Sequence, residues 1–395
     1  MGILSWSLAA GAQTSSPPIF GDTFVGDGVR YRQADWDDEL FPVNINNTWG
    51  YINQKGQLVV LPQYDWADHF HQGVGRVMIE GLTGYVNTEG RWVIEPQFKW
   101  ADRFEEGSAI VSDGRRFGVI NRSGRLTVPM TLDGALRFRE GLAAVQTGGR
   151  IGYIDRKAKQ IIAYQFSRAR SFHEGLAVAQ IPDARGVAGQ FGYINRQGEF
   201  VFNAVDLDLD DLGDFNSGMA PAMKQGKWGF INRQFEWVIE PVYDAVRGFF
   251  GGLAAVRLDQ RWGYVDDQGQ IIIEPQFDEA YDFDEVLALV KRDGRYGYCD
   301  REGQLSVAPQ FKSAWPYFRN CARVAQEPSF GYIDINGKII WDPRGVFDGL
   351  FDLTRIQSNG DVPRIPVAPL RRAAKVPYLP SYLDVEELPT PSQRR

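Results

Sequence analysis

Five aspartates lie within nine positions of this chain, and their spacing is the first pattern that could do chemistry. They are Asp206, Asp208, Asp210, Asp211 and Asp214. Alternating carboxylates suit calcium, which prefers oxygen ligands. The EF-hand loop also needs glycine at its sixth position and glutamate at its twelfth, whereas Asp211 and Ser217 stand there. We therefore interpret the segment as a solvated acidic loop. Asp206, Asp208 and Asp210 stay a weak candidate for a metal site, and the segment is the only candidate for an enzymatic one.

The other chemistry-bearing residues do not form a catalytic pattern. The histidines His69, His71 and His173 lack the Cys/His spacing of a metal site and are interpreted as exposed loop residues. Cys299 and Cys321 are too few for a disulfide framework and are interpreted as small core residues. The chain has no Gly-x-Ser-x-Gly elbow, P-loop or dinucleotide-binding glycine motif. We expect neither a catalytic residue nor a cofactor.

Three tryptophans are candidates for binding. Trp49, Trp228 and Trp262 each precede a glycine in the same short motif. Exposed aromatic rings could serve as stacking platforms for a saccharide, but aromatic side chains more often lie in a protein core. The saccharide interpretation therefore requires several of these tryptophans to be exposed to solvent.

These residues belong to a repeated unit that fills most of the chain. Its anchor is a bulky residue, a glycine, usually an aromatic, and then Ile or Val. The nine anchor glycines are Gly50, Gly84, Gly118, Gly152, Gly192, Gly229, Gly263, Gly297 and Gly331. Their spacings are 34, 34, 34, 40, 37, 34, 34 and 34 residues. Such a period is typical of a solenoid, propeller or array rather than of a conventional enzyme domain.

Each unit is predicted to be a three-stranded antiparallel β-meander. In the seventh copy the strands are expected at 253–257, 262–265 and 271–274, with Pro275 ending the last. Asn or Asp stands three residues after every anchor glycine, and Gly stands six residues after it in seven copies. This spacing is typical of a type I turn followed by a left-handed glycine. Ala158 and Phe235 replace that glycine, so we expect strain or a different loop there.

The anchor glycine and the segment between units are explained without a ligand. A glycine inside a strand often marks a close approach of another backbone, and we expect that role here. About ten residues connect successive units and carry a recurring phenylalanine, usually with a glycine three residues later. The phenylalanines are Phe70, Phe104, Phe138, Phe172, Phe215, Phe249 and Phe283.

The repeat resembles the WG-repeat family of bacterial proteins. Trp228-Gly229-Phe230-Ile231-Asn232, Trp262-Gly263-Tyr264-Val265-Asp266 and the Glu-Pro-Gln-Phe segments carry the resemblance, which covers roughly residues 36–343. It implies a binding or scaffold module and supplies no catalytic residue. We expect an all-β tandem array of nine repeats of about 34 residues. Because no unit is split between the two ends, an open or superhelical array is favoured. A closed propeller-like ring is the alternative.

Two flanking segments lack the repeat. Residues 1–35 form a leader, interpreted as a floppy segment or a signal fragment, and 344–395 form a proline-rich, largely irregular tail. The tail is either an idle end or a docking motif in which Tyr378 and Tyr382 bind. A cytoplasmic location is slightly favoured, and an extracytoplasmic one follows if the leader is a signal fragment. No run of 18 apolar residues occurs, so no membrane-spanning helix is expected.

The net charge of −7 argues against nucleic acid as the main partner, because phosphate binding needs a basic stripe. The favoured hypothesis is a non-catalytic repeat scaffold that mediates protein–protein interaction. A saccharide- or envelope-binding module is the alternative, and an enzyme with a site at the acidic segment is a remote one.

Overall fold

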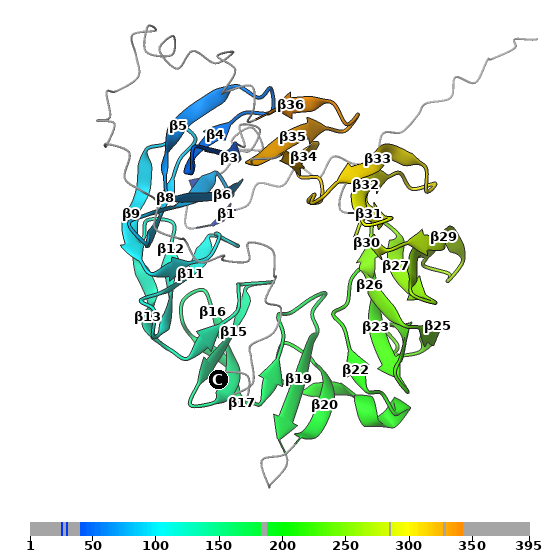
Figure 1. Cartoon of the computed structure of the whole chain (residues 1–395). Coiled ribbons are helices and arrows are strands. Elements are labelled where there is room, and N and C mark those ends of the chain that lie inside the picture. The colour runs from blue at the N-terminus through cyan, green and yellow to red at the C-terminus, as the bar shows by residue number, and fades with distance from the viewer. Residues whose placement is uncertain are drawn as a thin grey trace, which may run out of the picture.

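The computed structural model shows nine small antiparallel sheets arranged in a ring (Figure 1). It describes residues 25–26, 29–30, 40–182, 188–283, 286–326 and 329–342. We call the nine sheets blades 1 to 9 in chain order. In the predicted leader, only β1 (Val25–Gly26) and β2 (Val29–Arg30) are described, as a two-stranded antiparallel pair. The tail beyond residue 342, including Tyr378 and Tyr382, lies outside the described residues.

The strands follow one another in simple meanders. Blade 1 consists of β3 (Phe41–Ile45), β4 (Thr48–Ile52) and β5 (Leu58–Tyr64). Blade 2 consists of β6 (Trp66–His71), β7 (Val74–Ile79), β8 (Leu82–Val86) and β9 (Trp92–Phe98). Blade 3 consists of β10 (Trp100–Ala101), β11 (Ser108–Ser112), β12 (Phe117–Asn121) and β13 (Leu126–Leu132). Blade 4 consists of β14 (Gly134–Ala135), β15 (Leu142–Thr147), β16 (Arg150–Asp155) and β17 (Gln160–Phe166). Blade 5 consists of β18 (Arg168–Ala169), β19 (Ala177–Pro182), β20 (Ala188–Ile194) and β21 (Phe200–Asn203). Blade 6 consists of β22 (Asp211–Leu212), β23 (Met219–Lys224), β24 (Lys227–Asn232) and β25 (Trp237–Tyr243). Blade 7 consists of β26 (Ala245–Phe250), β27 (Leu253–Leu258), β28 (Arg261–Asp266) and β29 (Ile271–Phe277). Blade 8 consists of β30 (Glu279–Ala280), β31 (Ala288–Arg292), β32 (Arg295–Cys299) and β33 (Leu305–Phe311). Blade 9 consists of β34 (Cys321–Gln326), β35 (Ser329–Asp334) and β36 (Ile339–Trp341).

Blades 2 to 8 have four strands, one more than the sequence predicted. The additional strand comes first in each blade and arises from the segment expected to be a connection. It is only two residues long in β10, β14, β18, β22 and β30, which is too short to give an alternating pattern. In blade 3, for example, Trp100 pairs with Ser112 and Ala101 with Val111. The predicted three strands are present in every blade.

In blades 1 to 8 the anchor glycine is needed because the backbone of the last strand passes close to it. A Cβ built on Gly263 would lie 2.3 Å from the carbonyl oxygen of Ile273 and 2.7 Å from the nitrogen of Pro275. The register between β28 and β29 shifts at this point. Proline fits there because a bulge leaves its position unpaired. The predicted close backbone approach is therefore present, but Pro275 does not end the strand, which continues to Phe277.

The Asx turn between the last two strands also follows the prediction. In all nine copies the Asn or Asp side chain accepts hydrogen bonds from the backbone N–H groups two and four residues later, as in Asn53 with Lys55 and Gln57. The two copies without glycine keep the same turn. Ala158 and Phe235 have φ of 64° and 62°, a strained region for residues with a side chain. Of the two predicted outcomes, strain is the one found.

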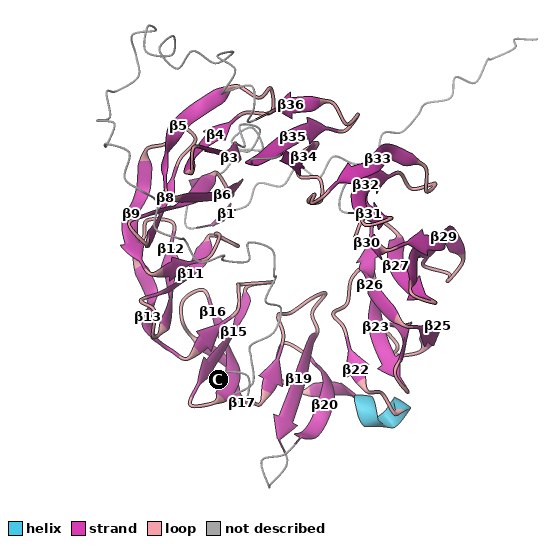
Figure 2. Ribbon diagram, in the orientation of Figure 1, coloured by secondary structure: helices cyan, strands magenta, loops and turns pink. Residues whose placement is uncertain are grey.

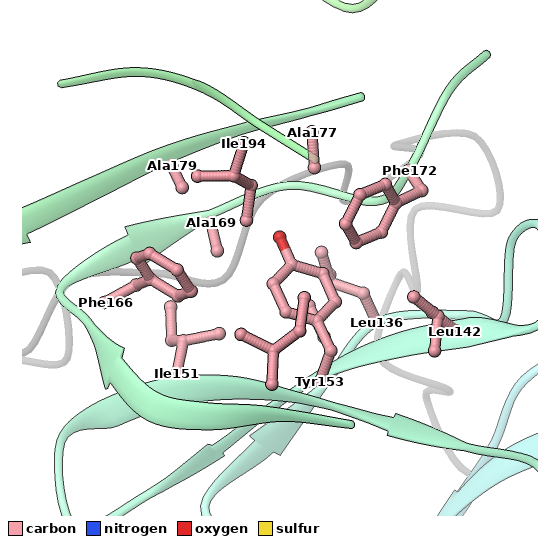
Figure 3. Close-up of a cluster of buried hydrophobic side chains, with 12 residues drawn as sticks. Leu136, Leu142, Ile151, Tyr153, Phe166, Ala169, Phe172, Ala177, Ala179 and Ile194 are labelled. Atoms are coloured by element: carbon pink, nitrogen blue, oxygen red, sulfur yellow. The ribbon is translucent and has the colours of Figure 1, made fainter. Parts of the chain in front are cut away.

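The hydrophobic core lies between blades, so each blade is stabilised by its neighbours. Figure 3 shows the cluster between blades 4 and 5, where Tyr153 points between Phe166 and Phe172. The Tyr153 and Phe172 ring centroids are 4.9 Å apart. The Tyr153 hydroxyl donates to the backbone carbonyl of Arg170 in the next blade, at 2.7 Å. The same tyrosine-to-carbonyl bond recurs from Tyr51, Tyr85, Tyr193, Tyr264 and Tyr298.

The ring is closed, so the favoured open array is wrong and the alternative is correct. Tyr332 of blade 9 donates to the carbonyl of Pro42 in blade 1 at 2.9 Å, although the two residues lie 290 positions apart. Closure does not use a split blade, which was the signal sought in the sequence. Instead, blades 1 and 9 are separate sheets that pack through a shared cluster including Phe41, Ile52 and Tyr332.

We call the interface between blades 1 and 9 the seam, and Phe41 makes it possible. It pairs with Ile52, and the residue at the same position of the other blades is always glycine or alanine: Gly75, Ala109, Ala143, Ala177, Ala220, Ala254, Ala288 and Ala322. A Cβ on Gly75 would lie 2.6 Å from the ring of Phe70, so the recurring phenylalanine occupies that space elsewhere. In blade 1 the Phe41 ring takes this place, 5.5 Å from Tyr332.

Candidate functional site

A cavity of about 920 Å³ lies against the inner wall of the ring. Its lining comes from blades 3 to 8, mainly from the first strand of each blade and the turn that follows. The charged lining residues are Glu105, Glu106, Glu140, Glu174, Asp214, Asp282, Arg139, Arg170 and Arg247. Most of these carboxylates already have a cationic partner: Glu106 lies 3.9 Å from Arg156, Glu140 lies 3.4 Å from Arg196, and Asp214 lies 4.0 Å from Arg170.

Glutamates in the lining of the cavity connect successive blades. Glu106 accepts from the backbone N–H of Gly141 at 2.8 Å, and Glu140 accepts from that of Gly175 at 2.9 Å. Glu174 accepts in the same way from Gly218 at 3.1 Å. These are charge-assisted bonds between neighbouring blades. They explain a repeated carboxylate without catalysis.

One part of the inner wall, in blades 6 and 7, carries apolar side chains. Trp228, Val246 and Phe250 line the cavity there, and Trp228 and Val246 pack against the same core cluster. Gly248 lies beside them. A Cβ at Gly248 would meet only the Phe250 ring, at 3.5 Å, so this wall has room for a side chain. This part of the wall thus combines an apolar surface with a gap.

The outside of the ring carries a second candidate surface. The last strand of the blades lies on the outside (Figure 1) and has one unpaired edge among the described strands. Exposed apolar side chains recur on these strands: Val59, Leu61, Trp92, Val93, Leu126, Ile161, Val201, Val238, Val242, Ile271, Ile272 and Ile339. We call this set the outer belt. The outer belt is therefore a candidate for a binding surface.

The outer belt is protected against pairing with further strands. Proline stands within β9, β25 and β29, and in each it follows an exposed glutamate: Glu95, Glu240 and Glu274. Proline and charge on edge strands prevent the addition of another strand. A ligand of the belt would therefore contact side chains rather than extend the sheet.

The three predicted tryptophans are brought to similar places but not together. Trp49, Trp228 and Trp262 are each half-buried against the core of their own blade interface. Trp228 lines the inner cavity. Trp262 lies beneath the guanidinium groups of Arg247 and Arg257. The most exposed of the described tryptophans is Trp92, at 40%. Its position on an outward-facing edge strand was the missed signal.

The acidic segment divides between the outside and the inside of the ring. Asp206 and Asp208 are exposed on the 3-10 helix η2 (Ala204–Leu207) and at its C-cap, drawn in cyan in Figure 2. Asp210 accepts from the backbone N–H of Gly226 at 3.0 Å. Asp211 and Asp214 reach the inner wall, near Arg168 and Arg170. Among the described residues, no three acid, histidine or cysteine side chains are grouped closely enough to hold a metal ion.

The hydrogen bond that Asp210 accepts has equivalents in other blades. The recurring position of these aspartates was visible in the sequence. Fifteen residues after the anchor glycine stand Asp65, Asp133 and Asp278, whose carboxylates accept from Glu80, Gly148 and Gly294 in the following hairpin. Asp210 occupies the same place after an insertion. Its recurrence indicates a structural role for this aspartate.

The histidines are more buried than the sequence predicted. His71 bonds to Glu105 of the next blade at 3.2 Å, and His173 lies 3.9 Å from Asp214. His69 packs between Phe41 and Phe318 at the seam. The pKa of His69 is lowered to about 4, mainly by burial; the nearby charge of Arg323 acts in the same direction, and Asp68 opposes both. The prediction of exposed loop histidines is therefore wrong, because the connecting segments pack along the ring: His69 and His71 lie in β6, and His173 forms an isolated bridge with Leu176.

The cysteines agree with their interpretation as core residues. Cys299 and Cys321 are both buried and both free. Burial raises the pKa of the Cys299 thiol to about 12, which suits an inert side chain. Within the described ranges, no helix has the length and apolar character needed to cross a membrane.

Comparison with known proteins identifies the repeat. The model of the WG containing repeat matches residues 49–82, 84–114, 117–150, 151–181, 191–228, 228–262, 262–296 and 296–327. No curated protein matches the chain.

Solved structures share the architecture at low sequence identity. A crystal structure of the eukaryotic initiation factor is 11% identical with a TM-score of 0.55, covering 77% of this chain and 95% of that one. Apo AztD from Citrobacter koseri is 13% identical with a TM-score of 0.39, covering 76% and 93%. BamB from Moraxella catarrhalis is 12% identical with a TM-score of 0.36, covering 68% and 89%. The first likeness shows the fold alone, and the other two are too weak to add to it.

Proposed function

Because this chain belongs to the WG-containing-repeat family, we propose that it is a non-catalytic scaffold whose ring binds a protein partner. The observation that carries the proposal is the outer belt, which exposes apolar side chains on most blades. Exposed apolar side chains that gather on a protein surface are typical of binding sites. Repeat architectures also offer long surfaces for partners.

The partner proposed here contacts side chains of the belt. Prolines and glutamates on the edge strands disfavour strand addition. Val59, Val93, Val238 and Ile272 lie nine residues after their anchor glycines and repeat with the blades. A partner that spans several blades would gain affinity from several weak contacts at once.

Capture from lysate of the source cells tests the proposal. The baits are the native chain, a belt variant with Val59, Val93, Val238 and Ile272 changed to Lys, and a control with Thr127→Lys and Ser306→Lys at the equivalent positions. We expect a partner that the native chain and the control retain and the belt variant loses. Equal capture by all three baits would remove the belt from the proposal. A further bait ending at Pro343 shows whether the tail contributes.

A saccharide-binding module is the second candidate, favoured by the exposure of Trp92 and the position of Trp228 in the cavity. Stacking of a sugar ring on either would change tryptophan emission. Titration of the native chain, Trp92→Ala and Trp228→Ala with cell-wall oligosaccharides tests it. A response that neither substitution reduces would exclude both tryptophans as platforms.

A further inference from the structure

A glutamate–arginine pair recurs where successive blades meet. The glutamate stands two residues after the recurring phenylalanine of one blade, and the arginine stands four residues after the anchor glycine of the next. The three pairs are Glu106 with Arg156, Glu140 with Arg196, and Glu174 with Arg233, separated by 3.9, 3.4 and 4.0 Å. Each glutamate also accepts from a backbone N–H of the next blade. Each junction of this kind is therefore a small carboxylate site that the chain fills with its own side chain.

The glutamates of these pairs have a strained backbone. Glu106, Glu140 and Glu174 have φ of 47°, 51° and 52°, in the left-handed region that disfavours residues with a side chain. Contacts of the carboxylate with the next blade help to offset this strain. The turn thus accommodates either glycine or a glutamate whose carboxylate is bound.

The junction between blades 7 and 8 has the arginine without the glutamate. Gly251 stands at the glutamate position with φ of 57°, so the turn has the same conformation but no side chain. Arg301 of blade 8 donates to the carbonyl of Gly251 at 2.5 Å, as Arg233 does to that of Glu174 at 2.6 Å. Its guanidinium group also lies over the Phe283 ring, 5.2 Å from the centroid. Arg301 therefore takes the place of its equivalents, whereas the position that supplies their carboxylate is empty of side chain.

The turn itself does not require an arginine at this position. At the junction between blades 6 and 7, Ser217 replaces the glutamate and Asp267 replaces the arginine, so both partners are exchanged together. In blade 2 the amide of Gln72 takes the place of the carboxylate and accepts from the N–H of Gly107 at 3.2 Å. In the described part of the ring, the arginine that faces glycine is Arg301.

We propose that Arg301 binds a carboxylate side chain of an acidic peptide segment, in the place that an internal glutamate fills at the other junctions. The planar guanidinium group suits a carboxylate because it can donate two parallel N–H bonds. Gly251 and Gly252 are exposed and Arg301 is half-buried, so a peptide can approach from solvent. The inference rests on the proposed function, because it names the chemistry of one segment of the protein partner.

Nuclear magnetic resonance of the arginine Nε–H groups in the full chain tests the site, because it follows each arginine separately even when binding is weak. Arg301→Lys and Arg233→Lys assign the two signals that matter. The probe is acetyl-tetraglutamate amide, whose carboxylates all lie on side chains, added at constant ionic strength. We expect a saturable shift of the Arg301 signal, whereas the Arg233 signal should not respond because Glu174 already occupies its site. Acetyl-tetraglutamine amide should move neither signal.

Exchange of glycine and glutamate at equivalent turns provides two matched variants. Gly251→Glu supplies an internal carboxylate in a conformation that Glu174 already adopts, and the three atoms nearest to the added Cβ belong to the flexible guanidinium group of Arg301. It should reduce the peptide-induced shift of the Arg301 signal at least tenfold. Glu174→Gly should do the reverse and make the Arg233 signal respond to the peptide. A thermal melt of each variant checks that the ring remains folded.

Two further ligands identify the source of the carboxylate. Acetyl-tetraglutamine with a free C-terminus tests a terminal carboxylate, and a response as strong as that to tetraglutamate would overturn the side-chain assignment. Acetate tests a free anion. A response to acetate that is as strong per carboxylate would overturn the assignment to a peptide.

Two results would overturn the site itself. One is an Arg301 signal that tetraglutamate does not move, and the other is a shift that Gly251→Glu leaves intact. Neither Gly251 nor Arg301 belongs to the outer belt, and the titration needs no captured partner. A failure of the belt variant to lose a partner can therefore be told apart from a failure of this site.

Discussion

At the scale of single residues, the ring depends on side chains that reach from one blade to the next. Tyr153 contributes both apolar packing and a hydrogen bond: its ring packs on Phe172, and its hydroxyl donates to the backbone carbonyl of Arg170. Burial raises the pKa of Tyr153, so the hydroxyl stays protonated and can donate. His69 at the seam is different, because no other blade carries a histidine at this position of the repeat. Its Nδ1 is buried and makes no hydrogen bond within the described part of the chain.

His69 is expected to make the stability of the fold pH-dependent. Its pKa is about 4 in the folded chain and about 6.5 when unfolded, so the unfolded state binds the proton first. Stability is therefore full above pH 6.5 and is lost as the pH falls towards 4. Linkage gives a loss of about 2 kcal/mol between pH 7 and pH 5. Urea unfolding at both pH values measures it, and His69→Phe should remove most of the difference. An equal difference in the variant would contradict the assignment.

At the scale of the elements, the same hairpin is built with different residues at its left-handed position. Most copies use glycine, which packs on an aliphatic side chain of the previous blade, as Gly269 does on Ile239. Phe235 adopts the same conformation but stacks on Phe202, with ring centroids 4.4 Å apart. Here β21 is short and is followed by η2, so the larger ring fills the space. Packing compensates for the backbone strain.

Glycine substitution at these two turns should have opposite effects. Ala158→Gly relieves the strain at φ of 64° and should stabilise the chain by roughly 0.5–1 kcal/mol. Phe235→Gly relieves the same strain but removes the stacking on Phe202, and should destabilise by about 3 kcal/mol. Thermal or urea unfolding of the two variants provides the comparison. Effects of the same sign would show that packing does not decide the choice of residue.

The anchor glycines should tolerate no side chain. A Cβ at Gly229 would lie 2.3 Å from the carbonyl oxygen of Ile239, so Gly229→Ala must move the backbone of β25. We expect the free energy of unfolding to fall by about 1–3 kcal/mol. Gly248→Ala is the control, because no backbone atom lies within 4 Å of its added Cβ. Equal unfolding midpoints for the two variants would refute the close-approach explanation.

At the scale of the whole molecule, closure depends on one interface that differs from the rest. Blade 1 lacks a described inner strand, and Phe41 replaces the recurring phenylalanine from within β3. Gly56 lies against the backbone of Ile340, whereas equivalent glycines contact side chains. The two ends of the repeat thus meet through contacts that are specific to the seam.

Removing the Phe41 ring should weaken the seam alone. Phe41→Ala is expected to cost roughly 3–5 kcal/mol at the seam. Hydrogen exchange should then accelerate in β3 and in β34–β36 while blades 4 to 6 stay protected. Phe172→Ala is the matched control, and its effect should appear in blades 4 and 5. Unchanged exchange in β34–β36 of the Phe41 variant would show that this ring does not close the molecule.

The sequence by itself determined the repeat, its turns and its family. Nine anchor glycines, the Asx three residues later and the following glycine are local features, and local geometry suffices to interpret them. The tertiary structure decided the closure, the inner strands and the burial of the histidines. Two-residue strands carry no alternation, and closure depends on the small curvature accumulated over nine blades, which no single repeat encodes. The departure of Phe41 from a position otherwise held by Gly or Ala was visible, but its meaning required Tyr332 beside it.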